Sequence, residues 1–181
     1  MIKIPVALTK YVLFASLLFW GNWCQNTMQD MENRQEGLAT TFYFIRHAEK
    51  ETANKNDRNP DLTNVGIERS NKWAGIFEFI DLDAIFSTNY KRTRNTAKPI
   101  AVSKNLPVER LNYPEIPYDS LLSVYKGKQI LFVGHSNTTP EMVNYLLGSD
   151  VYAQMDENDY GSLFVVTLID KKATSTRLNL D

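Results

Sequence analysis

The stretches TFYFIRHAEK (Thr41–Lys50) and ILFVGHSN (Ile130–Asn137) determine the fold expected for this chain. Each begins with β-branched and aromatic residues, which favour a buried strand, and each strand runs directly into a histidine. Similar apolar runs alternate along the chain with segments of helical periodicity. This alternation is typical of an α/β domain built around a mostly parallel sheet.

Six strands and four helices are expected in this domain. The strands are expected at Thr41–Ile45, Ala84–Ser87, Val108–Leu111, Ile130–Val133, Ser162–Ile169 and Thr174–Leu180. The helices are expected at Asn64–Ile80, Arg92–Lys104, Tyr118–Tyr125 and Pro140–Leu147. Thr63 and Gly148 have the residue types of an N-cap for the first helix and a C-cap for the last. Helical spacing predicts one apolar face on the first helix, formed by Ile67, Trp73, Ala74, Phe77 and Ile80.

Length and composition restrict the class of protein. The chain has 181 residues, 43% of them hydrophobic, which suffices for one core but not for two full domains. Its 20 Lys and Arg against 21 Asp and Glu argue against a nucleic-acid partner bound through a broad basic surface. One Cys and two His exclude a structural zinc site and an internal disulfide.

The first 23 residues differ from the rest of the chain. Lys3 and Lys10 make the start of the sequence basic, and the apolar run Tyr11–Trp20 follows them. This run has the length of a secretory signal core and is short for a membrane span. We expect residues 1–23 to be a signal peptide and the protein to be exported to the periplasm or cell envelope. A buried N-terminal helix is the alternative.

A polar segment separates this signal from the domain. Cys24 lies where a bacterial lipoprotein carries its lipidated cysteine, so attachment to the membrane through Cys24 is a second expectation, although Trp23 fits that pattern poorly. Residues 24–40 lack apolar periodicity and are expected to form a tether. The domain is expected to span residues 41–181.

Both histidines, His47 and His135, directly follow predicted strands. Carboxyl ends of parallel strands meet at one edge of a sheet, where ligands bind, so the two side chains can converge there. Arg46 lies beside His47, and Arg92 begins an expected helix. Guanidinium groups and helix N-termini both bind phosphate, so these four residues predict a phosphate pocket.

Two charged segments are interpreted as solvated surface. Lys91 and Arg94 cannot share one narrow helix face with Arg92. The acidic loop Ser149–Gly161 could rim the pocket, but an ordinary surface loop is the favoured interpretation.

Four segments, in this order, resemble the signatures of the histidine phosphatase superfamily, also called phosphoglycerate-mutase-like. They are RHAEK (Arg46–Lys50), LTNVG (Leu62–Gly66), STNYKRTRNTA (Ser87–Ala97) and GHSN (Gly134–Asn137). The resemblance is greatest for the short phosphohistidine-phosphatase-like members. It implies a three-layer α/β/α sandwich in which His47 becomes phosphorylated. It also implies that Arg46, Arg92 and His135 hold the phosphoryl oxygens.

The chemistry of this reaction is consistent with these residue types. Cationic donors can stabilise a transferring phosphoryl group without a metal, so no cofactor is expected. Repulsion by Arg46 and Arg92 is expected to keep His47 neutral and nucleophilic. The expected activity is hydrolysis of a phosphomonoester or phosphoramidate, with a small phosphorylated molecule or a phosphoprotein as substrate. The alternative is a non-catalytic module that binds a phosphorylated ligand.

The general acid is the residue that the sequence leaves open. Glu115 is favoured and Asp119 is next, because both lie in the loop after the third strand; Glu49 is a further option. Glu141 is a weaker candidate, since Thr138-x-x-Glu141 has the pattern of a capping box.

Overall fold

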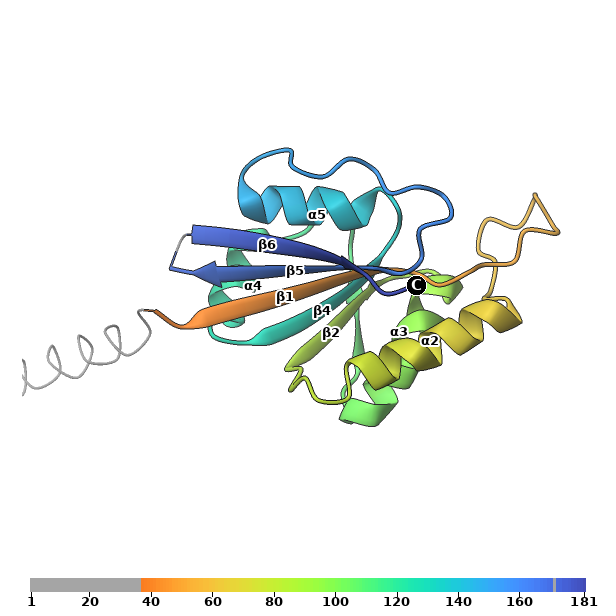
Figure 1. Cartoon of the computed structure of the whole chain (residues 1–181), viewed down its shortest axis with the longest axis horizontal. Coiled ribbons are helices and arrows are strands. Elements are labelled where there is room, and N and C mark those ends of the chain that lie inside the picture. Colours follow the sequence, from red (N-terminus) through yellow and green to blue (C-terminus); the bar gives the residue numbers. More distant parts are fainter. Residues whose placement is uncertain (1–36, 171) are drawn as a thin grey trace, which may run out of the picture. The chain divides into compact units, whose positions relative to one another are not determined.

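In the computed structural model, which describes residues 37–170 and 172–181, six strands form one sheet. The strands are β1 (Ala39–Arg46), β2 (Ala84–Thr88), β3 (Val108–Leu111), β4 (Gln129–Gly134), β5 (Ser162–Ile169) and β6 (Lys172–Asn179). Their order is β3-β2-β4-β1-β5-β6, and the four strands from β3 to β1 are parallel (Figure 1). β5 and β6 are antiparallel to their neighbours, so the sheet is mixed.

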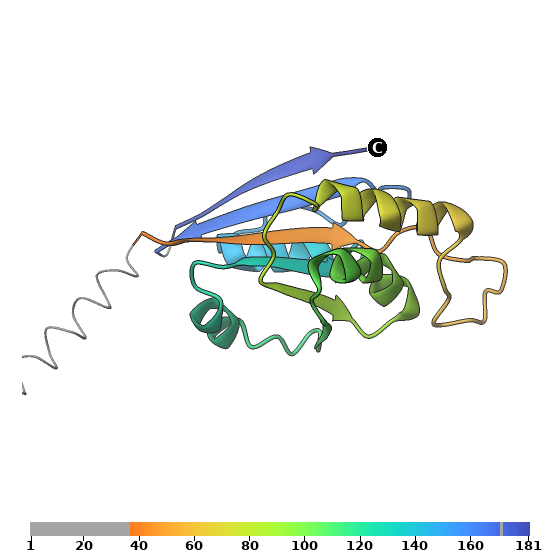
Figure 2. The same ribbon diagram turned by 90° about the horizontal axis from the view of Figure 1, so that it is seen from below.

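Helices cover both faces of this sheet (Figures 1 and 2). They are α2 (Asn64–Ile76), α3 (Lys91–Lys104), α4 (Tyr118–Val124) and α5 (Thr138–Leu147). Phe42 and Phe44 of β1 pack into the core shared with α4 and α5, whereas Ile45 packs into the core shared with α2 and α3. Both faces of the sheet are therefore buried, and the expected three-layer α/β/α sandwich is confirmed.

Three stacked phenylalanines align the central strands. Phe44 of β1, Phe132 of β4 and Phe86 of β2 are register partners. The ring centroids of Phe44 and Phe132 are 5.1 Å apart, and those of Phe132 and Phe86 are 5.2 Å apart. Cross-strand aromatic pairs of this kind stabilise one register. The residue that follows each strand is thereby fixed at the carboxyl edge of the sheet.

The apolar face predicted for the first helix is partly wrong. α2 ends at Ile76, and Ile67 is 49% exposed. The buried positions are Gly66, Ser70 and Trp73, followed by Phe77 just after the helix. Gly66 and Ser70 are small, so hydrophobicity alone does not identify this face, and Ile67 lies one position away from it.

The capping box expected at Thr138 and Glu141 is also wrong. α5 begins at Thr138, and the hydroxyl of Thr138 accepts from the backbone N–H of His135 at 2.9 Å. The Glu141 carboxylate accepts from the Tyr113 hydroxyl instead of closing back on the helix. The start of α5 thus holds His135 rather than capping itself.

The other expected caps are confirmed. Thr63 accepts from the backbone N–H of Gly66 at 3.1 Å, and Gly148 ends α5 with a φ of 67°. β1 begins at Ala39, so Ala39 and Thr40 belong to the domain and not to the expected tether. The predictions for residues 1–23, for Cys24 and for the tether up to residue 36 lie outside the described residues. Within the described part of the chain, no helix has the length and apolarity needed to cross a membrane.

We predict that Gly66→Ala lowers the free energy of unfolding by about 1–3 kcal/mol, because a β-carbon there would lie 2.2 Å from the Glu49 carbonyl oxygen. Gly75, in the same helix, has nothing within 4 Å of that position. Gly75→Ala is the matched control and should leave stability unchanged or raise it by up to about 1 kcal/mol. Urea unfolding of both variants checks this, and equal effects would contradict the close approach at Gly66.

Candidate active site

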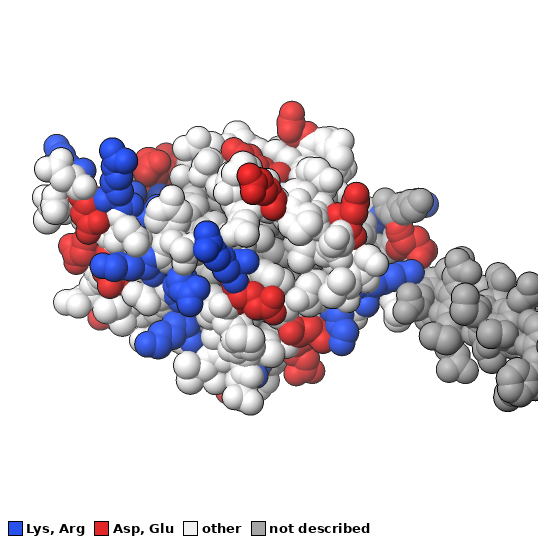
Figure 3. All heavy atoms as spheres, turned by 180° about the vertical axis from the view of Figure 1, so that it is seen from behind, with Lys and Arg blue, Asp and Glu red and all other residues white. Residues whose placement is uncertain are grey.

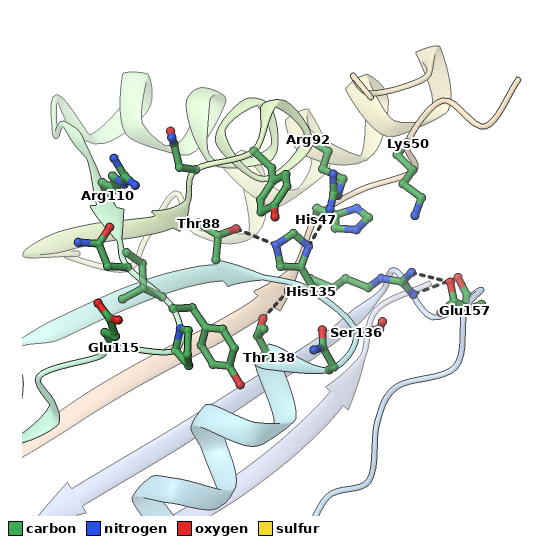
Figure 4. Close-up of a pocket in the computed structure, with 18 residues that line it drawn as sticks. His47, Lys50, Thr88, Arg92, Arg110, Glu115, His135, Ser136, Thr138 and Glu157 are labelled. Carbon is green, nitrogen blue, oxygen red and sulfur yellow. Dashed lines mark hydrogen bonds and ion pairs between the residues drawn. The ribbon is translucent and has the colours of Figure 1, made fainter. Parts of the chain in front are cut away.

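The two histidines meet at the carboxyl edge of the parallel strands (Figure 4). Pairing of β1 with β4 places Arg46 opposite Gly134, and the backbone N–H of His47 donates to the Gly134 carbonyl at 2.9 Å. The imidazole centroids of His47 and His135 are consequently 5.4 Å apart. The structure therefore brings together two side chains from distant parts of the sequence.

His47 has one nitrogen bound to the backbone and one left for chemistry. Its side chain lies 2.7 Å, through Nδ1, from the carbonyl oxygen of Ala48. A carbonyl only accepts, so Nδ1 carries the proton of the neutral ring and Nε2 has the lone pair. The backbone N–H of Ala48 is itself held by the Thr96 hydroxyl at 2.9 Å. This arrangement fixes the ring orientation that a nucleophilic imidazole needs.

Burial keeps both imidazoles neutral. It lowers the pKa of His47 to about 3, with smaller contributions from His135 when that ring is charged and from the charges of Arg92 and Arg46. It also lowers the pKa of His135 to about 4, assisted by Arg92, Lys50 and Arg46. Charge repulsion by the arginines, which we expected to be the main cause for His47, is thus secondary to loss of water.

Arg92 has guanidinium donors that the protein does not use. Its Nε and one terminal nitrogen are buried and have no hydrogen-bond partner among the described residues. The other terminal nitrogen donates to Nδ1 of His135 at 3.5 Å. The guanidinium lies over the Tyr90 ring, 4.4 Å from its centroid. Unused buried donors beside two neutral histidines are suited to binding an oxyanion.

Arg46 is bound differently. It is almost completely buried, and one terminal nitrogen donates to the carbonyls of Asp156, Glu157 and Asp159 at 2.8, 3.0 and 3.2 Å. The other pairs with the exposed Glu157 carboxylate at 3.4 Å, and the guanidinium lies 4.4 Å from the centroid of Tyr160. The loop 149–161 therefore rims the site, and its interpretation as an ordinary surface loop is wrong.

Arg46, His47, Arg92, His135 and Glu115 all line one pocket of about 860 Å³. Glu115 and Arg110 lie at one end of this pocket, and Glu157 and Lys50 lie at the other (Figure 4). Lys91 and Arg94 are exposed and outside its lining, as predicted. Its volume far exceeds that of a phosphate group, so a substrate has room for its leaving group here.

The other carboxylates considered as acids have different surroundings. Both oxygens of Glu49 are held by Nε of Arg69, at 2.8 and 3.0 Å. Asp119 lies on α4 and is outside the pocket lining. Among the candidates considered, only Glu115 contributes a carboxylate to the pocket.

Sequence reasoning missed Thr88, Tyr90, Tyr160 and Lys50. Thr88 ends β2, and its hydroxyl lies 2.9 Å from Nε2 of His135. Thr88 could have been found, because it ends a strand in the same way as the residues that precede the histidines. Tyr160 lies more than a hundred residues from Arg46 along the chain, and nothing in its local sequence indicates the stacking.

The positive charge of the site is local. Basic and acidic side chains are intermingled over the face shown in Figure 3. Across residues 37–170 and 172–181, no group of three or more His, Cys, Asp or Glu side chains could hold a metal ion. The cationic side chains that line the pocket include Arg46, Arg92 and Lys50.

We predict that acid destabilises the fold through these histidines. The folded pKa values are lowered below the ordinary 6.5, so the unfolded chain binds more protons and stability is lost as pH falls from about 6.5 towards 4 and below. Each histidine accounts for at most about 2 kcal/mol between pH 7 and 5. Urea unfolding at both pH values should show a smaller loss for His47→Gln than for the wild type. An NMR titration showing either imidazole positively charged, with both nitrogens protonated, at pH 6 would contradict this assignment.

A family model gives an independent comparison. The model of the histidine phosphatase superfamily (branch 1) matches residues 42–112, which include Arg46, His47 and Arg92. No curated protein matches the sequence significantly. His135 lies beyond the matched segment and is placed in the site by the structure.

Solved structures share the fold. The alpha-ribazole phosphatase from Shigella flexneri has a TM-score of 0.64 and 18% identity, over 77% of this chain and 96% of that chain. The protein histidine phosphatase SixA complexed with tungstate has a TM-score of 0.61 and 17% identity, over 77% and 96% of the two chains. A phosphoglycerate mutase from Bacillus anthracis has a TM-score of 0.61 and 13% identity, over 80% and 95%.

At these identities the structural likeness establishes the fold, while the family match establishes the motifs. Together they agree with the resemblance seen in the sequence, since residues 42–112 include three of its four signature segments. The chain is therefore similar to the histidine phosphatase superfamily (branch 1) over residues 42–112, and it shares its fold with the solved structures above.

Proposed function

We propose that this protein is a phosphatase that hydrolyses a phosphomonoester or phosphoramidate through a phosphohistidine on His47, without a metal. The observation that carries the proposal is the state of His47. Its Nδ1 is tied to the Ala48 carbonyl, so its Nε2 lone pair is available beside unused donors of Arg92. A neutral nucleophile next to fixed cationic donors is what phosphoryl transfer requires.

In the first step the phosphoryl group of the substrate binds to Arg92, His135 and Arg46. Nε2 of His47 attacks phosphorus, and the bond from phosphorus to the leaving oxygen breaks. The leaving oxygen takes a proton from Glu115. The products of this step are the free alcohol, the Glu115 carboxylate and a phosphoramidate on His47.

In the second step water releases the phosphate. The Glu115 carboxylate accepts a proton from a water molecule while the oxygen of that water attacks phosphorus. The bond between phosphorus and Nε2 breaks, and its electron pair returns to the His47 ring. Inorganic phosphate then leaves, and the starting state is restored.

Glu115 is proposed as the acid and base because of its surroundings. It lines the pocket from the loop after β3, and its carboxylate makes no hydrogen bond or ion pair with the described residues. Glu49, by contrast, is neutralised by Arg69. A phosphoramidate substrate has a better leaving group and would depend less on Glu115.

The proposed substrate is a small phosphorylated molecule or a phosphoprotein. The pocket volume of about 860 Å³ supports a substrate larger than phosphate itself, and the solved structures with this fold include one described as an alpha-ribazole phosphatase and one described as a protein histidine phosphatase. We further propose that the protein is exported to the cell envelope, on the strength of the signal-like residues 1–23, with Cys24 as a lipid anchor. N-terminal mass analysis of the mature protein tests this, because an unprocessed Met1 would refute export.

We predict that His47→Ala abolishes turnover of nitrophenyl phosphate and that Arg92→Ala lowers it about 100-fold or more. Quenching during turnover should trap a phosphoramidate on the peptide containing His47, labile to acid and stable to base. EDTA should leave the rate unchanged, because the donors are side chains. Phosphate-competitive binding without turnover would instead support a non-catalytic binding module.

We predict that Glu115→Gln slows hydrolysis of an alkyl phosphate far more than that of nitrophenyl phosphate, whose leaving group is already a stable anion. Steady-state rates on both substrates measure the difference. Asp119→Gln is the control, since Asp119 is outside the pocket lining. Equal losses on the two substrates would remove Glu115 from the role of acid.

A further inference from the structure

A directional chain of hydrogen bonds runs from His135 into the junction between β2 and α3. Nε2 of His135 lies 2.9 Å from the Thr88 hydroxyl, which donates to the Thr93 hydroxyl at 3.1 Å. The Thr93 hydroxyl donates in turn to the Thr88 carbonyl at 2.7 Å and lies 3.0 Å from that of Tyr90. Thr88 is 5% exposed and Thr93 is fully buried, so water does not compete for these groups.

The ends of this chain determine its direction. Carbonyl oxygens only accept, so the Thr93 hydroxyl donates its proton to the carbonyls of Thr88 and Tyr90. The Thr88 hydroxyl donates its own proton to the Thr93 hydroxyl. Thr88 can then only accept from Nε2 of His135. At the other nitrogen, Arg92 can only donate, which requires a lone pair on Nδ1. The opposite tautomer would place two donors face to face at Nδ1.

His135 and His47 therefore carry their protons on different nitrogens. His47 is protonated at Nδ1 by its bond to the Ala48 carbonyl, whereas His135 is protonated at Nε2. In Figure 4 Nε2 of His135 points to Thr88, and its other nitrogen lies towards Arg92 and His47. Only this second nitrogen can reach an oxyanion bound between the two arginines.

We propose that Thr88 is a positioning residue that keeps Nε2 of His135 occupied, so that this ring takes its second proton on Nδ1, facing the phosphoryl group. The inference rests on the proposed function of the pocket. When an oxyanion binds, Arg92 turns its donor from Nδ1 to an oxyanion oxygen, and Nδ1 takes a proton from solvent. Nδ1–H then donates to a second oxygen, and the proton returns to solvent when phosphate leaves.

The charges around His135 make this protonation depend on the ligand. Burial is the main factor that disfavours a second positive charge on the ring, and Arg92, Lys50 and Arg46 add to it. His47 is its neutral neighbour. A bound dianion offsets that repulsion. His135 is thus neutral in the empty pocket and becomes a charged donor only when the pocket is filled.

The experiment is NMR of protein labelled with ¹⁵N-histidine, with and without tungstate as the oxyanion. The wild type should show Nε2–H alone on His135 when free and both nitrogens protonated when tungstate is bound. Thr88→Val removes the acceptor and should populate both tautomers and weaken tungstate binding about 10-fold or more. Thr88→Ser keeps the hydroxyl and should bind within about 3-fold of the wild type.

Two further variants separate positioning from loss of fold. Thr40→Val removes another buried hydroxyl, which accepts from Gly127 far along β1, and should leave both signals unchanged. Thr93→Val removes the group that accepts the Thr88 proton, so the Thr88 hydroxyl can donate to Nε2 and both tautomers of His135 should appear. This variant replaces Thr88→Val in the test if Thr88→Val does not fold.

Each outcome is decisive. The inference would be overturned if Thr88→Val, or Thr93→Val in its place, kept the Nε2–H tautomer and bound tungstate as tightly as the wild type. The proposed phosphatase function would not be affected by that result. Wild-type protein that binds tungstate as described but shows no turnover would overturn the proposed function and leave this role of Thr88 standing. A wild type that does not bind tungstate would overturn both.

Discussion

The parallel pairing of β1 with β4 is the interaction on which the site depends. It aligns Arg46 with Gly134, so the residues that follow them, His47 and His135, emerge side by side. A slip of one residue would turn every side chain of β1 to the other face of the sheet and take Phe44 out of its aromatic stack. The apolar burial that selects the register therefore also sets the geometry of the site.

Burial has a second effect, because it removes water as a partner for the imidazoles. Without water, a charged ring is costly, and the nearest protein groups determine which nitrogen carries the proton. For His47 that group is the Ala48 carbonyl, and for His135 it is the Thr88 hydroxyl. Two identical side chains thereby acquire different roles, one with a lone pair for attack and one with a nitrogen that can gain a proton.

Much of the fold and of the candidate site could be predicted from the sequence, because the residues that indicate them are neighbours along the chain. A strand followed at once by Arg46 and His47, and another by His135, indicates the α/β fold and the convergence of these side chains in one pocket. Predictions from periodicity or motif failed where tertiary contacts decided the outcome. Ile67 is exposed because the buried face of α2 consists partly of small residues. Glu141 accepts from the hydroxyl of Tyr113, in a loop distant along the chain, instead of capping α5. The partners of Arg46 lie more than a hundred residues away.

The two arginines look equivalent in the sequence, but folding separates their roles. One terminal nitrogen of Arg46 donates to three carbonyls of the loop 149–161, so Arg46 holds this loop beside the site. Arg92 keeps two buried nitrogens without partners among the described residues. A buried donor left unpaired costs about 1–3 kcal/mol, a cost that an incoming oxyanion removes. In the proposed complex with an oxyanion, Arg92 is consequently the group whose interactions change most, and its contact with Nδ1 makes His135 sensitive to the same event.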